Sequence, residues 1–110
     1  MRSIVSSVSG VSTGGAYDDL NIDKRTVEED VVWTHLAARD VTTAPTSIGL
    51  YLRQGSSMYL LKEANPVTAN LAVDVSPGVH VPGDWQPVAR FTGATLADVL
   101  ELYAYGYVED

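Results

Sequence analysis

Residues 48–61 read IGLYLRQGSSMYLL, and this stretch decides the fold class. Every second residue from Ile48 to Leu52 is large and apolar, which is the period-two pattern of a strand with one buried face. The turn-forming residues QGSS follow at 54–57, and residues 58–61 begin a second apolar run. Two such runs joined by a short Gly-containing turn predict a β-hairpin.

The segments on either side of this hairpin repeat the pattern of short strand and turn. Alternating or β-branched runs occupy residues 27–38, 71–75, 79–81 and 85–91, and turns rich in Pro, Gly, Asp or Ser separate them. Strict alternation in the first run assigns one face to Val31, Trp33, His35 and Ala37. No helical pattern intervenes, so we expect an all-β fold: an antiparallel, jelly-roll-like β-sandwich with seven or eight short strands.

The segment at residues 96–104 is compatible with a helix or a strand. Thr95 and Asp98 stand at the spacing of a helical capping box, and Leu96, Val99, Leu100 and Tyr103 have helical spacing. Tyrosine-rich alternation favours a strand, although Gly106 weakens it. The alternating residues are Val99, Glu101, Tyr103, Tyr105 and Tyr107. The strand is the favoured interpretation, with a turn at residues 93–98 before it.

The first 24 residues differ in composition from the remainder, because residues 3–15 consist almost wholly of Ser, Val, Gly and Thr. They contain too few bulky side chains for a core of their own. We therefore expect residues 1–24 to be a flexible or strand-adding N-terminal arm and residues 25–110 to be the sandwich domain. The β-branched side chains that would suit a strand added to a neighbouring subunit are Ile4, Val5, Val8 and Val11. The alternative is a disordered tail.

The charge balance excludes two classes of partner. Fourteen acidic residues against seven Lys and Arg leave a net charge of −7. Phosphate repels an acidic surface, so we expect no nucleic-acid partner and no docking on anionic membranes. The chain has no cysteine, which excludes disulfides, thiolate nucleophiles and Cys-based zinc sites, and which favours a reducing compartment.

Motifs for catalysis are missing from the sequence. His35 and His80 stand alone, outside any HExxH or similar metal spacing. No serine lies in a GxSxG setting, and no phosphate-binding glycine loop occurs. The acidic run at residues 28–30 begins a predicted strand, where neighbouring side chains point to opposite faces, so a solvated charge cluster that protects a strand edge is expected. We predict no enzyme, no catalytic residues, no metal and no cofactor.

The aromatic side chains suggest where a partner would bind. Trp33, Trp85 and Phe91 are expected in the core of so small a domain. Tyr103, Tyr105 and Tyr107 share one face of the last strand, and such an amphipathic surface suits a subunit interface. The alternative for these tyrosines is ordinary packing between the two sheets.

The C-terminal half resembles the closing strands of small virion proteins of tailed bacteriophages, on residues 76–79 (SPGV), 84–93 (DWQPVARFTG) and 98–107 (DVLELYAYGY). The resemblance implies a virion component that decorates or cements a capsid, or that connects head and tail. Its expected partners are further copies of itself and other virion proteins, such as the capsid shell or neck. The alternative function is a carbohydrate-binding module of a fibre or adhesin, with exposed Tyr or Trp beside Asp.

Overall fold

The structure is a computed structural model that describes residues 1–109. Within this range the chain forms β-strands and connecting turns, and no helix occurs. The strands are β1 (Arg2–Val11), β2 (Tyr17–Asn21), β3 (Asp30–Asp40), β4 (Ser47–Gln54), β5 (Ser57–Ala64), β6 (Val73–Val75), β7 (Val79–Pro82), β8 (Gln86–Thr92) and β9 (Val99–Glu109). No helix in the described residues is therefore long and apolar enough to cross a membrane.

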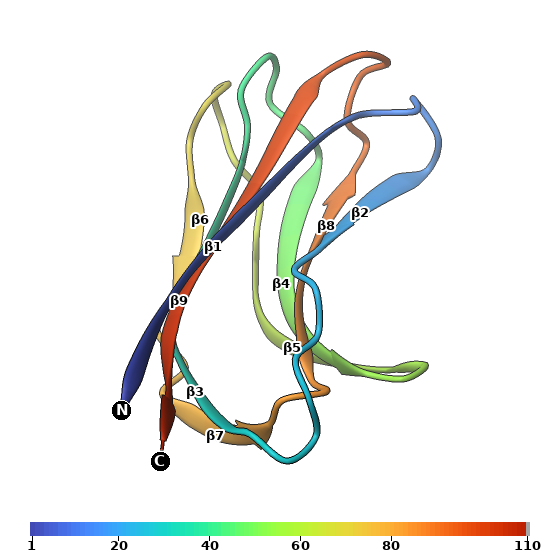
Figure 1. Cartoon of the computed structure of the whole chain (residues 1–110). Helices are drawn as coiled ribbons and strands as arrows, with labels where there is room; N and C mark the ends of the chain where they lie inside the picture. Colours follow the sequence, from blue (N-terminus) through green and yellow to red (C-terminus); the bar gives the residue numbers. More distant parts are fainter. Residues whose placement is uncertain (110) are drawn as a thin grey trace.

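The strands form two antiparallel sheets that pack face to face (Figure 1). Sheet A has the order β1-β9-β3-β6, with β7 also paired to β3, and sheet B has the order β2-β8-β4-β5. The chain passes repeatedly from one sheet to the other, which makes the topology that of a jelly roll with β7 as an additional short strand. The predicted all-β, antiparallel sandwich is confirmed, with nine strands where seven or eight were expected.

The core lies between the sheets and is supplied by alternate residues of each strand. The predicted hairpin is strands β4 and β5, joined by a two-residue turn in which Gly55 has a φ of 58°. Ile48, Leu50 and Leu52 of β4 all point inward and are buried. Trp33 and Phe91 are buried against them from β3 and β8, as the sequence predicted for these two aromatic residues.

Strand β3 departs from the strict alternation expected for it. A β-bulge at Thr34 shifts the pairing with β9, so that Trp33 lies opposite Gly106 but His35 lies opposite Tyr105. One extra residue in a strand exchanges the two faces beyond it. Trp33 and Leu36 therefore both point into the core, and the prediction that His35 shares a face with Trp33 is wrong.

Residues 1–24 are part of the sandwich. β1 pairs with β9 over its whole length, and β2 pairs with β8. Ile4 and Ile22 contribute to the core. The connection between β1 and β2 is held by Asp18, whose side chain accepts hydrogen bonds from Ser12 Oγ at 2.7 Å and from the Thr13 backbone N–H at 3.0 Å. The boundary expected at residue 25 therefore does not separate an arm from a domain.

The last segment is strand β9, as favoured from the sequence. Thr95 and Asp98 make one of the two contacts of a capping box, since the Thr95 backbone N–H donates to Asp98 Oδ2 at 3.1 Å. The same residues close a turn through the bond from the Asp98 N–H to the Thr95 carbonyl at 3.0 Å. Ala97 lies between them with a φ of 71°, which is incompatible with a continuing α-helix.

Candidate subunit interface

The strand register brings the two predicted contact regions together on the outer surface of sheet A. Val5 of β1 lies directly opposite Tyr105 of β9. Directly opposed residues in an antiparallel pair point to the same side of the sheet. The pairs Ser3 with Tyr107 and Ser7 with Tyr103 flank this one. We call the surface made by Val5, Tyr103, Tyr105 and Tyr107 the tyrosine face.

The alternation of β1 divides the four residues that the sequence analysis had grouped as contacts. Ile4 points inward and is only 7% exposed, and Val8 is partly buried against the core. Val5 and Val11 point outward and are 76% and 64% exposed. Ile4 thus belongs to the core, and only two of the four side chains are open to a partner from the outer surface.

A second exposed apolar pair lies farther along the same surface. Val11 is opposite Val99, which is 42% exposed, while Tyr105 beside Val5 is 39% exposed. Between the two pairs lies a shallow hollow of about 180 Å³, lined by Ser7, Val8, Ser9, Glu101 and Tyr103. Exposed apolar side chains that flank a polar hollow suit a contact with another protein.

Two polar side chains from β3 complete the tyrosine face. The His35 ring stacks on Tyr105 with a centroid distance of 6.1 Å and an interplanar angle of 15°. Its Nδ1 lies 3.1 Å from Ser76 Oγ. Arg39 places its guanidinium over the Tyr103 ring, 5.8 Å from the centroid. Sequence reasoning missed both residues, because only the bulge at Thr34 brings them to the outer surface.

Arg39 also forms an ion pair that charges one end of the face. Its Nε donates to Glu101 Oε1 at 2.6 Å, and its Nη2 donates to the Tyr103 hydroxyl at 3.4 Å. The hydrogen bond from Arg39, followed by that from Tyr103, lowers the pKa of Glu101. The hydrogen bonds that Arg39 donates to Glu101 and to Tyr103 raise the pKa of Arg39. The face therefore carries a fixed pair of opposite charges beside its apolar centre.

The remaining candidate residues do not assemble into a catalytic group. His80 lies on β7, with its Nδ1 3.5 Å from Glu109 Oε2. Glu29, in the acidic run at residues 28–30, pairs with Arg25 at 3.0 Å and with Arg2 at 3.3 Å. Residues 1–109 contain no cluster of three or more His, Cys, Asp or Glu side chains that could hold a metal ion.

A pair of buried aspartates at the end of the sandwich was not found from the sequence. Asp40 ends β3 and Asp98 precedes β9, and both side chains are buried. Burial, and then a hydrogen bond to Asp98, raise the pKa of Asp40. Burial also opposes ionisation of Asp98, but hydrogen bonds from Asp40, Thr43 and the Thr95 backbone outweigh it and lower the pKa of Asp98. Of the two carboxyl groups, Asp40 therefore keeps its proton to a higher pH than Asp98 does.

Comparisons with known proteins identify the fold and no family. No family model matches the sequence, and no curated protein matches it. A solved structure described as Bacillus endospore appendages, a family of disulfide-linked pili, superposes with a TM-score of 0.50 and 13% identity, covering 99% of this chain and 90% of that one. The core of a Drosophila protein, NLP, described in terms of pentamer formation and histone binding, has a TM-score of 0.46 and 8% identity over 98% of both chains. At these identities the likeness to the pilus subunit concerns the β-sandwich fold alone.

Proposed function

We propose that this protein is a structural subunit that assembles with further copies of itself through the tyrosine face. The observation that carries the proposal is the opposed pair of Val5 and Tyr105, which leaves a large aliphatic and a large aromatic side chain exposed side by side. Aromatic side chains with polar neighbours are the usual centres of protein interfaces. His35 and Arg39 supply such neighbours here.

We further propose that the assembly is a virion, in which the subunit decorates the capsid or connects head and tail. The support is the sequence resemblance of residues 76–107 to phage virion proteins, together with a surface suited to protein contact and a net charge of −7 that disfavours direct contact with the packaged genome. Co-sedimentation of the protein with purified particles in a density gradient tests this assignment. Its consistent recovery away from the particles would contradict it.

The carbohydrate-binding alternative has little support from the two tryptophan side chains. Such a site needs an aromatic ring open to solvent, and Trp33 is buried in the core. Trp85 is half-buried and stacks on Tyr59, with a centroid distance of 5.1 Å. Reproducible binding on a glycan array that is lost on replacing Tyr59 would restore this alternative.

Replacing Tyr105 with threonine is expected to weaken self-association by about thirtyfold in Kd. Central aromatic side chains of interfaces often contribute about 2 kcal/mol or more, and threonine keeps the preference for a strand while removing the ring. Sedimentation velocity over a concentration series measures the change, and thermal unfolding checks that the variant is folded.

The matched control is Tyr59→Thr, because Tyr59 is an exposed tyrosine on β5 of the opposite sheet. This variant should associate as the unchanged protein does. Equal dissociation constants for Tyr105→Thr and the unchanged protein would contradict the use of the tyrosine face. A monomeric unchanged protein at all concentrations would contradict self-assembly itself.

A further inference from the structure

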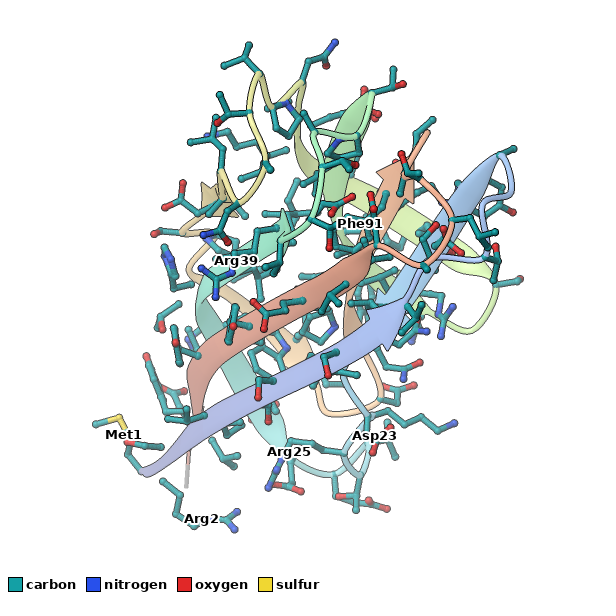
Figure 2. The ribbon with its side chains drawn as sticks, turned by 90° about the horizontal axis from the view of Figure 1, so that it is seen from above. Met1, Arg2, Asp23, Arg25, Arg39 and Phe91 are labelled. Carbon is teal, nitrogen blue, oxygen red and sulfur yellow. The ribbon has the colours of Figure 1, made fainter. Side chains whose placement is uncertain are left out.

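Strand β1 leaves one long edge of sheet A open. It pairs with β9 on one side, and within residues 1–109 no strand pairs with its other side. The pairing with β9 runs without a bulge over all ten residues, and the only charged side chain of the strand is that of Arg2. Figure 2 shows β1 beside β9, with the segment that carries Asp23 and Arg25 on its other side.

The other edge strands have features that prevent a strand of another molecule from pairing with them. β2 has five residues, β6 has three, and β7 has four and ends in Pro82. β5 is longer, but it contains a bulge opposite Leu50 and Tyr51 and carries Lys62 and Glu63. Short length, proline, bulges and charges all protect edges from added strands. β1 has none of these over residues 3–11.

The charge distribution also favours β1 over the other sheet edges for pairing between two copies. The molecule carries fourteen acidic residues, and none of them lies within residues 1–17. The edge strands β2, β5 and β6 carry Asp18, Glu63 and Asp74, so pairing of two copies at those edges would bring carboxylates together, which costs free energy and slows association. Along β1 the facing side chains are Ser, Val, Ile and Gly, which introduce no such repulsion.

A groove beside the open edge provides room for a second strand. It has a volume of about 470 Å³ and is lined by residues 5–8 of β1 and residues 21–25. Figure 2 shows Asp23 and Arg25 on the latter segment, which runs alongside β1.

We propose that β1 of one copy pairs antiparallel with β1 of a second copy, so that the two A sheets become one continuous sheet across a twofold axis. Core-facing residues must oppose core-facing residues, which restricts the register. Centring the pair on Ser6 places Ile4 opposite Val8 of the partner subunit and Ser3 opposite Ser9 of the partner subunit. The backbone hydrogen bonds supply affinity, as in other cases of strand addition.

This inference rests on the proposed function, since it names the second contact that a growing assembly needs. A twofold contact through β1 closes on itself and yields only a dimer. The tyrosine face remains exposed in that dimer, and the two copies present their faces on the same side of the continuous sheet. Two independent contacts per subunit permit a larger closed or extended assembly.

Disulfide formation between two single-cysteine variants tests the proposed register, and the chain has no cysteine of its own to interfere. Ser3→Cys and Ser9→Cys are prepared separately, mixed and oxidised. Opposed residues have Cα atoms about 4.5–5.5 Å apart, which is within disulfide range. Identical residues would lie six positions apart, or about 20 Å. We expect the mixed disulfide to exceed either homodisulfide by about tenfold or more.

Three other results would each contradict the proposal, and they can be distinguished from one another. A statistical mixture of the three disulfides, with an oligomeric unchanged protein by native mass spectrometry, overturns the β1 pairing and leaves the proposed function intact. Preferential linkage of Ser3→Cys to Ser57→Cys, a control on β5, shows that the open edge receives β5 instead. A monomeric unchanged protein contradicts both the pairing and the proposed assembly.

Discussion

Replacing Gly106 with alanine is expected to lower the free energy of unfolding by about 3 kcal/mol, at the upper end of the range for overpacking. A Cβ at this position would lie 2.3 Å from the carbonyl oxygen of Val32 and 3.1 Å from Cε3 of Trp33. The first of these is a backbone atom, so strand β3 must move to relieve the contact. The movement would disturb the bulge that turns Trp33 inward and His35 outward.

Chemical denaturation followed by tryptophan fluorescence measures this effect directly, because the buried Trp33 reports on the affected region. Gly15→Ala is the matched control. A Cβ at Gly15 meets only the Thr13 hydroxyl oxygen, at an ordinary distance of 3.4 Å. The control should remain within about 0.5 kcal/mol of the unchanged protein. A Gly106→Ala variant as stable as this control would contradict the close packing of β3 on β9.

Replacing Asp98 with asparagine is expected to cost about 1–3 kcal/mol at neutral pH, whereas Asp40→Asn is expected to stabilise the protein there. Asp98 Oδ2 accepts hydrogen bonds from the Thr43 hydroxyl and from the Thr95 backbone N–H. Asparagine in its place loses the charged acceptor. Asp40 Oδ1 accepts from the backbone N–H groups of Thr42 at 3.0 Å and Thr43 at 3.1 Å. Asparagine at position 40 keeps that acceptor and resembles the protonated acid.

The pH dependence follows from the opposite directions of the two pKa shifts. The pKa of Asp40 is raised in the folded state, mainly by burial, so its contribution is full below the unfolded value of about 3.9 and is lost as the pH rises through the folded pKa. The pKa of Asp98 is lowered, so its contribution is present above about 3.9 and is lost as the pH falls through the folded pKa. Asp40→Asn should therefore remove a decrease in stability that the unchanged protein shows as the pH rises above about 4.

Denaturation series between about pH 4 and pH 8 separate these expectations, since they span the range above the unfolded pKa of aspartate. Asp23→Asn makes the same chemical change at an exposed position and serves as the control. The stability of Asp23→Asn should change with pH in the same way as that of the unchanged protein. Parallel pH profiles for Asp40→Asn and the unchanged protein would contradict a raised pKa of Asp40 in the folded state.

The parts of the fold that were predicted correctly are those whose signal is local. The β4–β5 hairpin was evident because alternation from Ile48 to Leu52 and the turn at Gly55 lie within one short stretch. Strand β9 was favoured over a helix because its tyrosines recur at period two. The turn before it depends on Ala97, whose positive φ no local residue preference indicates.

The N-terminal strands were not recognised because their side chains are small. Residues 3–15 contain little apolar bulk, which resembles the composition of a linker. Their order comes from pairing with β8 and β9, and the residues of β9 that pair with β1 lie about 90 to 105 positions away in the chain. A strand stabilised mainly by hydrogen bonds to a distant partner has a weak sequence signal of its own, since strand preference depends on context.

In the candidate site, too, some features follow from the sequence and others only from the tertiary structure. The sequence by itself determined that the fold is an antiparallel sandwich and that Tyr103, Tyr105 and Tyr107 share one face, because side-chain direction along a strand follows a period of two. Only the tertiary structure decided that Val5 and His35 join that face and that Ile4 is core. Register between distant strands, and a single bulge at Thr34, set which side chains become neighbours.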